Sequence, residues 1–388
     1  MHAAPAEPGL RAWLRSRFEL SRHGPGQHLP AMDGLRGVAV LLVFGVHFAT
    51  QAEPWLADGT VFTLLLAALR RIGHAGVDLF FVLSGLLIYG ALIAGRWHYA
   101  GFMRRRLQRL YPTFLAVFLL YLLLSLLMPG QSKLPAAPAD AAMYLLANLL
   151  LLPGLFPIEP MISVAWSLSY ELAFYLLMPV LVVALRLRQW SSRQRMLLFL
   201  GLALLTALNI ATVQGHVRFV MFLAGVLLFE AMRRRPPLAT QALPALLAVV
   251  LALVIDGVRP VGSVGFALRT VAMAAAFWLL CHVALTQPAG PLARALSWEP
   301  LRWLGAMSYS FYLIHSLALK AVFLLLAHAW AAQPMPVAWH LAAAAVSFGG
   351  SLLASAALFL AVERPLSLAP RPRPVASAAP APVEVTGR

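Results

Sequence analysis

The sequence predicts an all-α protein, a polytopic bundle of helices that crosses a membrane about ten times. Of its 388 residues, 61% are hydrophobic and 11% are charged, whereas a soluble domain carries about 25% charged residues. The mean hydropathy is +0.80, and the apolar residues form runs long enough to cross a bilayer. The formal charge of +16 lies in short arginine clusters between these runs. This pattern is a membrane topology signal, and it argues against a nucleic-acid-binding surface.

The pattern divides the chain into three parts. Residues 1–32 are rich in Pro, Gly and Arg and are expected to form a cytoplasmic arm. They lack the apolar core of a cleavable signal peptide, so the first span should also be the insertion signal. Residues 33–363 form the membrane domain, and residues 364–388 form an Ala/Pro-rich cytoplasmic tail that we expect to be disordered. The expected spans are about 33–52, 75–95, 110–128, 164–186, 196–213, 216–232, 238–256, 266–286, 303–326 and 339–362.

One segment, 141–157, decides the topology. It is apolar but short, and it ends in Pro153, Gly154 and Pro157. If it crosses the membrane, the arginines at 186–195 lie outside; if it is re-entrant or interfacial, they lie inside. The second arrangement places 22 of the 30 basic residues in cytoplasmic segments and 6 in outer segments. Because basic residues gather on the cytoplasmic side, we adopt it, and both termini are then cytoplasmic.

The first span contains both Arg36 and His47. Charged or titratable side chains at membrane depth are costly and indicate a functional site by default. A spacing of eleven residues places both side chains on one helical face, roughly 16 Å apart along the axis. One face therefore presents a permanent cation near the cytoplasm and a proton-transfer group near the outside. Arg36 could hold a phosphate or the polar part of an elongated donor, or it could extend to lipid headgroups.

Two carboxylates are expected in the same outer half of the membrane as His47. Asp78 lies near the start of the second span, and Glu171 lies within the fourth. An imidazole oriented by a carboxylate can be a general base. The alternative is that these groups only pair to hold helices together. His282 has no companions at metal-ligand spacing beside Cys281, so we expect no metal.

A dense basic cluster follows the second span. It consists of Arg104, Arg105, Arg106 and Arg109. Guanidinium groups bind phosphate oxygens in pairs, so the cluster is a candidate polyphosphate site. The alternative is that it sets the topology and binds lipid headgroups.

Further polar residues lie inside the spans. Ser308, Tyr312 and His315 fall broadly on one side of the ninth span, as a buried hydrogen-bond network or as a binding surface would require. Ser84 and Ser169 could be nucleophiles, although a serine in a membrane helix more often bonds its own backbone.

Six segments, in order, resemble the membrane-bound acyltransferase family 3, the O-acyltransferases that modify bacterial surface sugars. They are residues 33–47, 76–85, 102–112, 166–175, 304–315 and 362–365. The resemblance spans nearly the whole chain. It implies a ten-helix, multi-pass protein of the bacterial inner membrane with both ends cytoplasmic.

The resemblance also implies an activity: transfer of an acyl group, commonly acetyl, from cytoplasmic acyl-CoA to a sugar or glycolipid hydroxyl on the periplasmic side. The family's arginine–histidine pair corresponds to Arg36 and His47. Its Arg-x-Arg motif corresponds to Arg104 and Arg106, with Arg105 leaving the register open. Further candidate binding residues are Arg109 for the donor and Trp166, Ser169, Tyr312 and His315 for the acceptor. Some relatives have an added C-terminal hydrolase-like domain. A 25-residue tail is too short for one, so we expect direct transfer or completion by a separate periplasmic acyltransferase.

Together these observations form one hypothesis. The phosphates of acyl-CoA bind the basic cluster, and its pantetheine arm passes Arg36. His47, oriented by Asp78 or Glu171, then removes the proton of the acceptor hydroxyl. The acceptor, the acyl group, the oligomeric state and the existence of a covalent acyl-enzyme stay open. The rival functions are a proton-coupled transporter or flippase of an envelope intermediate and a non-catalytic scaffold of a polysaccharide-assembly complex.

Overall fold

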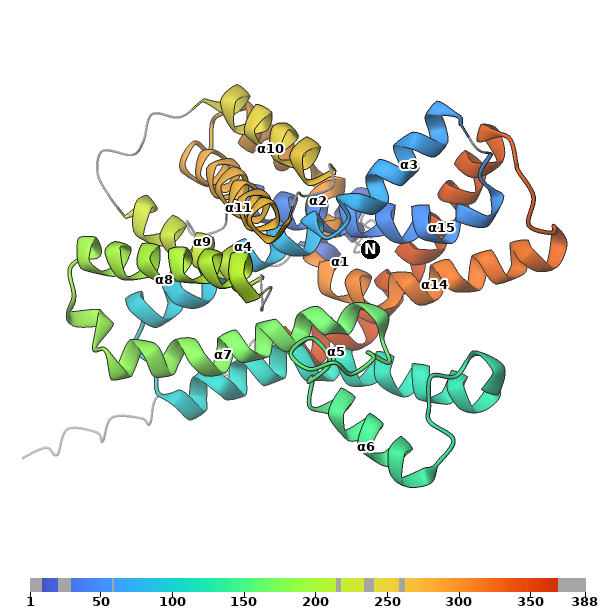
Figure 1. The fold of residues 1–388 in the computed structure, drawn as a ribbon, viewed down its shortest axis with the longest axis horizontal. Coiled ribbons are helices and arrows are strands. Elements are labelled where there is room, and N and C mark those ends of the chain that lie inside the picture. The colour runs from blue at the N-terminus through green and yellow to red at the C-terminus, as the bar shows by residue number, and fades with distance from the viewer. Residues whose placement is uncertain are drawn as a thin grey trace, which may run out of the picture.

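The computed structural model describes residues 9–19, 29–57, 59–213, 218–233, 241–257 and 262–368. All regular structure in these residues is helical, as predicted (Figure 1). The α-helices are α1 (Leu10–Phe18), α2 (Pro30–Gln51), α3 (Val61–Arg71), α4 (Ala75–Ala94), α5 (Tyr99–Leu127), α6 (Pro138–Leu149), α7 (Trp166–Ala184), α8 (Ser192–Val213), α9 (Phe219–Met232), α10 (Ala242–Gly257), α11 (Gly262–Thr286), α12 (Pro291–Leu296), α13 (Glu299–Ala306), α14 (Ser308–Ala329) and α15 (Val337–Leu358). Single 3₁₀ turns are η1 (Glu53–Trp55), η2 (Pro129–Gln131), η3 (Ser163–Ala165) and η4 (Leu187–Gln189), and η5 (Phe359–Ser367) is a π-helix.

Eight helical segments of the described chain are long and apolar enough to cross a membrane. They are Pro30–Gln51, Val61–Ala94, Tyr99–Leu127, Ser163–Ala184, Ser192–Thr212, Gly262–Thr286, Ser308–Ala329 and Val337–Ser367. Two shorter apolar helices, α9 and α10, lie where the sixth and seventh spans are expected. A multi-pass helical membrane protein is therefore confirmed, whereas the count of ten spans and the cytoplasmic termini stay predictions.

The structure describes part of each expected terminal segment, and only the start of the expected tail differs from expectation. The arm contains the short helix α1, and residues 364–367 continue the π-helix η5. The remainder of the expected tail, 369–388, lies outside the described residues, as do residues 1–8 and 20–28 of the arm.

The segment 141–157, expected to be re-entrant or interfacial, overlaps α6, which has 12 residues. At about 1.5 Å per residue it is roughly 18 Å long, shorter than the hydrocarbon core of about 30 Å. Asn148 holds the loop after the helix, because its Oδ1 accepts the Met161 amide at 2.7 Å and its Nδ2 donates to Glu159 O at 3.3 Å. This length agrees with a segment that does not cross.

Leucines face outward on the peripheral helices, as a bilayer allows. On α8, Leu197, Leu204 and Leu205 are more than 60% exposed. In water such a surface would be an association site; in a bilayer it contacts lipid tails. The polar side chains that face inward are therefore the informative ones.

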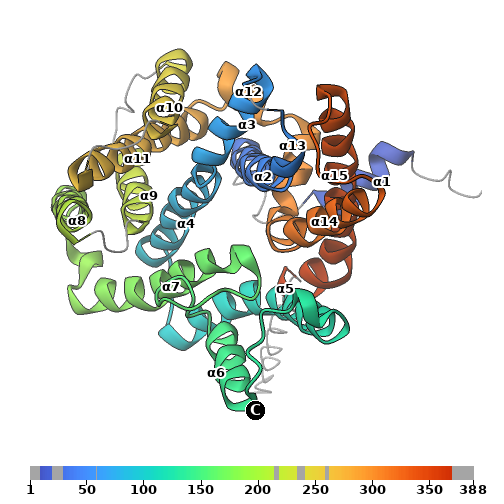
Figure 2. The same cartoon turned by 45° about the vertical axis from the view of Figure 1, so that its right-hand side comes forward.

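Helix α2 contributes residues to both hydrophobic cores of the bundle, and Figure 2 shows it between α4 and α14. Leu35 and Ala39 on one face belong to the core shared with α4, α7 and α9. Val40 and Phe44 on another face belong to the core shared with α14 and α15. Its remaining surface carries Arg36 and His47, so these side chains lie where the two halves of the bundle meet.

Two glycines allow α2 to approach α12 and α13 closely. A Cβ at Gly34 would come within 1.9 Å of the Leu296 carbonyl oxygen, and one at Gly305 within 1.8 Å of the Asp33 oxygen. Neither position can hold a larger residue without moving a backbone. The first glycine of the segment Asp33-Gly-Leu-Arg-Gly therefore allows the start of α2 to pack against the end of α12.

Candidate functional site

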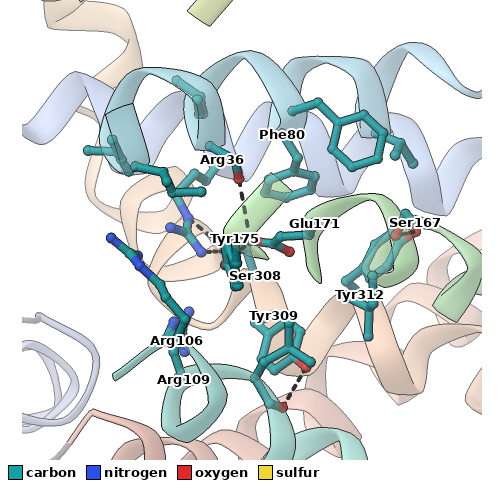
Figure 3. Close-up of a pocket in the computed structure, with 18 residues that line it drawn as sticks. Arg36, Phe80, Arg106, Arg109, Ser167, Glu171, Tyr175, Ser308, Tyr309 and Tyr312 are labelled. Carbon is teal, nitrogen blue, oxygen red and sulfur yellow. Dashed lines mark hydrogen bonds between the residues drawn. The ribbon is translucent and has the colours of Figure 1, made fainter. Parts of the chain in front are cut away.

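Two cavities open on either side of the contact between α2 and α14. We name the first the arginine pocket. Its polar lining residues are Arg36, Ser84, Arg106, Arg109, Ser167, Glu171, Tyr175, Ser308, Tyr309 and Tyr312. Figure 3 shows the three arginines toward one end of this pocket and Ser167 and Tyr312 at the other. We name the second the histidine pocket. Its polar lining residues are His47, Gln51, Tyr121, Ser125, Gln131, Lys133, Ser163, Ser316 and Lys320.

Helices α2 and α14 run in parallel past both pockets. Arg36 donates to Ser308 Oγ from Nε at 3.1 Å and from Nη2 at 3.0 Å. Further along both helices, the rings of His47 and His315 meet edge to face with centroids 5.0 Å apart. Both helices therefore contribute to each pocket, and the predicted eleven-residue spacing places Arg36 in one and His47 in the other.

The arginines of the arginine pocket are positioned in different ways. Arg109 forms an ion pair with Glu363 of η5, which also accepts the Ser310 amide at 3.0 Å. The Glu363 side chain is fully buried. Arg106 has its guanidinium carbon 5.5 Å from the ring centroid of Tyr175, and within the described residues it forms no hydrogen bond or ion pair. Its donors are therefore free for an anionic ligand.

The structure shows which arginines of the basic cluster face the arginine pocket. Arg104 and Arg105 are exposed and are not among the lining residues, whereas Arg106 and Arg109 line the arginine pocket. A spacing of three residues keeps these two on one face of α5, while a spacing of two does not. Of the expected Arg-x-Arg pair, only Arg106 therefore faces the cavity.

Glu171 does not contact His47, contrary to expectation. Its carboxylate lies in the arginine pocket, where it accepts from Tyr175 and from Ser84 Oγ at 3.4 Å. The hydropathy pattern placed Glu171 within the fourth span, but depth alone did not specify which neighbour it faces. Its position among three guanidinium groups explains how a carboxylate is tolerated there.

Asp78 does not orient His47 either. Both oxygens of its buried carboxylate accept from Arg218 Nη1 at 2.7 Å, and His74 Nε2 lies 3.9 Å away. This arrangement is the alternative stated above, a pair that joins helices. Arg218 lies near the start of the expected span 216–232, where the sequence pattern alone gives no reason to pair it with Asp78.

His315 is the imidazole that faces His47. Its Nδ1 lies 2.9 Å from Phe311 O and 2.8 Å from Tyr312 O. Because carbonyl oxygens only accept, Nδ1 must carry the proton, and Nε2 is left as an acceptor 3.3 Å from Ser316 Oγ. His47 itself forms no hydrogen bond or ion pair with any described residue, so its ring nitrogens are available to a substrate.

The remaining predicted residues have mainly structural partners. Tyr312 donates to Val164 O at 2.8 Å and contacts Ser167 Oγ at 2.8 Å, while its ring lines the arginine pocket. Ser169 Oγ accepts the Gly154 amide at 3.0 Å, and Trp166 packs against Tyr170. Neither Ser169 nor Trp166 is among the residues that line the two pockets.

The sequence interpretation assigned no role to Tyr175, Tyr309, Glu363 or Lys320. Glu363 lies in the segment 362–365 of the family resemblance, and Lys320 lies within the ninth expected span. An intramembrane charge is itself the signal that could have identified Lys320. Among the described residues, no group of three or more His, Cys, Asp or Glu could hold a metal ion.

The fold and the two cavities define a class: a multi-pass helical protein with a cation-lined pocket and a histidine-lined pocket on one helix pair. Comparison with protein families specifies that class. The family model for the acyltransferase domain Acyl_transf_3 matches residues 29–356, so the chain belongs to this family. The match covers α2 to nearly the end of α15 and therefore includes both pockets.

Three individual relatives show which named proteins the chain is similar to. The acyltransferase MdmB of Streptomyces mycarofaciens is 35% identical over 159 residues, covering 39% of this chain and 38% of MdmB. The O-acetyltransferase OatA of Staphylococcus aureus is 31% identical over 179 residues, covering 43% of this chain and 26% of OatA. The peptidoglycan O-acetyltransferase OatA of Listeria monocytogenes is 25% identical over 324 residues, covering 74% of this chain and 49% of that OatA. The chain thus matches less than half of each relative's length, and no solved structure matches it.

Proposed function

We propose that this protein is a transmembrane O-acyltransferase. It moves an acyl group, acetyl in the first instance, from acyl-CoA in the arginine pocket to a sugar hydroxyl in the histidine pocket. The observation that carries the proposal is the pair of cavities on α2 and α14, with Arg36 in one and His47 in the other. The names of the relatives, an acyltransferase and two O-acetyltransferases, support the reaction class.

The arginine pocket suits the donor. Acyl-CoA carries several phosphate charges, and guanidinium groups bind phosphate oxygens through paired hydrogen bonds. Arg106 has free donors for this purpose, and within the described part of the chain Arg36 donates only to the neutral Ser308 hydroxyl. Arg109 is compensated by Glu363, so we assign it a positioning role. The arginine pocket then opens toward the cytoplasm, in agreement with the basic-residue bias.

The partition between the pockets is thin. Tyr312 lines the arginine pocket and Ser316 lines the histidine pocket. These residues are four apart on α14, which is about 6 Å along the helix. A thioester carried on the pantetheine arm past Arg36 therefore needs to cross about one helical turn to reach His47.

His47 is the general base in this mechanism. The acceptor hydroxyl oxygen attacks the thioester carbonyl carbon while a ring nitrogen of His47 takes the hydroxyl proton. The carbon–sulfur bond then breaks, and the proton passes to the leaving thiolate, which gives the ester and free CoA. His315 positions the His47 ring by edge-to-face contact. General-base help of this kind contributes roughly 10²–10⁴ in rate.

The decisive experiment measures both chemistry and movement. Purified protein in vesicles receives acetyl-CoA labelled in the acetyl group, with a sugar acceptor on the opposite side. We expect acceptor-dependent release of free CoA and transfer of the label to an ester. His47→Ala should lower the rate by roughly 10²–10⁴, while His328→Ala, an exposed histidine at the end of α14, should retain it.

Two outcomes would replace the proposal. A transporter would move a labelled substrate without consuming the thioester. A scaffold would leave cellular acylation unchanged when Arg36 and His47 are both substituted. Full activity of a folded His47→Ala protein would remove the histidine from the mechanism while leaving the reaction class in place.

A further inference from the structure

The histidine pocket holds a cation that the mechanism does not use. Lys320 lies within α14 and lines the pocket together with His47. It is half-buried, and it forms no hydrogen bond or ion pair with any residue that the structure describes. An intramembrane ammonium without a counter-charge is costly, so its retention indicates a ligand.

Lys320 lies one helical turn beyond the histidines. On α14 the pocket is lined by Ser316, Leu317, Lys320, Ala321 and Leu324, a set spaced as one helical face. Lys320 follows Ser316 by four residues, and Gln51 on α2 follows His47 by the same interval. Each interval is about 6 Å along its helix. Along their own helices, Lys320 and Gln51 therefore lie about one turn beyond His315 and His47, on the side away from Ser308 and Arg36.

The rest of the lining does not neutralise this charge. No aspartate or glutamate occurs among the described residues that line the histidine pocket. Lys133, the other lysine there, is already paired, because its Nζ lies 3.0 Å from Glu159 Oε1 and donates to Pro160 O at 2.9 Å. The hydroxyls and amides of the pocket suit the hydroxyls of a sugar, and Lys320 adds an uncompensated positive charge.

We propose that the acyl acceptor is an acidic sugar, with a carboxylate or phosphate group that Lys320 binds while His47 faces the hydroxyl to be acylated. The inference rests on the proposed function and specifies its substrate class. Lys320 is then a specificity-determining residue. The anion and the reacting hydroxyl would lie within about one sugar ring of each other, because only one helical turn separates the two protein groups.

The test compares acceptors that differ only in charge. Purified protein in vesicles receives acetyl-CoA and one of three acceptors: methyl glucoside, methyl glucuronide or the methyl ester of methyl glucuronide. We expect kcat/KM to be roughly 10- to 100-fold higher for the glucuronide, the range of a charge-assisted hydrogen bond, and the ester to behave as the glucoside does. Lys320→Met should abolish the preference, so that the ratio of kcat/KM for glucuronide to that for glucoside falls to about one, and Lys320→Arg should restore it. Leu325→Met, at an exposed position of the same helix, is the matched control.

Other outcomes overturn the inference in distinguishable ways. Equal rates on charged and neutral acceptors would overturn the acidic acceptor but leave the acyltransferase in place. A Lys320-dependent preference for succinyl-CoA over acetyl-CoA on the glucoside would assign the anion to the acyl group and reject the assignment to the acceptor. Thioester that is never consumed with any acceptor would overturn the proposed function and this inference with it.

Discussion

The arginine pocket and the histidine pocket share α2 and α14 but hold their polar groups differently. In the arginine pocket, Arg36 is bonded to Ser308, Arg109 to Glu363, and Glu171 to Tyr175. In the histidine pocket, neither His47 nor Lys320 has a hydrogen-bond partner within the described part of the chain. The first site is thus pre-organised by its own bonds, whereas the second depends on a substrate to complete it.

This difference suits the two ligands of the proposed reaction. A donor common to many enzymes can be bound by a rigid set of charges, since rigidity reduces the entropic cost of binding. A base must be open to the proton that it removes, and bonds to protein groups would compete with that role. The comparison therefore predicts that substitutions in the arginine pocket affect stability and donor binding, while those in the histidine pocket affect catalysis and acceptor choice.

The largest stability effect is expected at the ion pair of η5. Glu363→Gln leaves the Arg109 guanidinium in the bundle without its counter-charge, which we expect to cost roughly 3–5 kcal/mol of the free energy of unfolding. Unfolding in detergent, followed by helical circular dichroism, measures this loss. Lys320→Met should cost nothing in the same assay, because it removes a cation that has no protein partner.

A double variant sharpens the interpretation. If the loss comes from the uncompensated charge, Arg109→Met added to Glu363→Gln should recover most of the stability, and the coupling energy of the cycle gives the interaction of the pair. Additive losses would instead attribute the effect to the two Ser310 bonds of the Glu363 carboxylate. The arginine pocket would then not be held by paired charges.

A smaller effect, on donor binding, is expected to distinguish Arg106 from Arg104. Arg106→Ala should raise the KM for acetyl-CoA by roughly 10- to 100-fold, the loss of one charge-assisted bond to phosphate. Arg104→Ala, at an exposed position two residues away, should change it less than about threefold. Initial rates of CoA release over a range of acetyl-CoA concentrations measure both. Equal effects would mean that the Arg-x-Arg spacing, rather than the cavity, defines the donor site.

The sequence could predict the helices and the two ends of the site, but not the contacts between helices. The Arg36–His47 spacing depends only on helical period, which explains why the structure places the two residues in successive pockets. The partners of Asp78 and Glu171 depend on how separate helices pack, which one-dimensional patterns do not record. Asp78 pairs with Arg218, the residue before α9, and Glu171 lies among the arginines of the arginine pocket.

A similar limit explains Arg106 and Lys320. Choosing between Arg104 and Arg106 required the rotation of α5 relative to the pocket, which neighbouring helices set. Lys320 could have been weighed from sequence as an intramembrane charge, but only its place beside His47 gives that charge a substrate. The position of a charged residue along a span can thus be predicted from the sequence. The neighbour that its side chain faces depends on how the helices pack in the bundle.

The smallest expected effect concerns the contact between α1 and α13. Glu299 forms ion pairs with Arg11 and Arg15, and the hydrogen bond from Arg15 lowers the pKa of the Glu299 carboxyl. A lowered folded-state pKa means that the contact stabilises α1 above the unfolded-state pKa and is lost as pH falls through the folded one. Glu299→Gln imitates the protonated state at neutral pH. We expect faster trypsin cleavage at Arg11 and Arg15, and a wild-type cleavage rate that rises at acid pH when corrected for the activity of the protease.

Because α13 packs on α2 near Arg36 through Gly305, the variant should change the KM for acetyl-CoA slightly and leave acceptor preference unchanged. A change in acceptor preference instead would mean that the two pockets are not independent, and the comparison between them would fail.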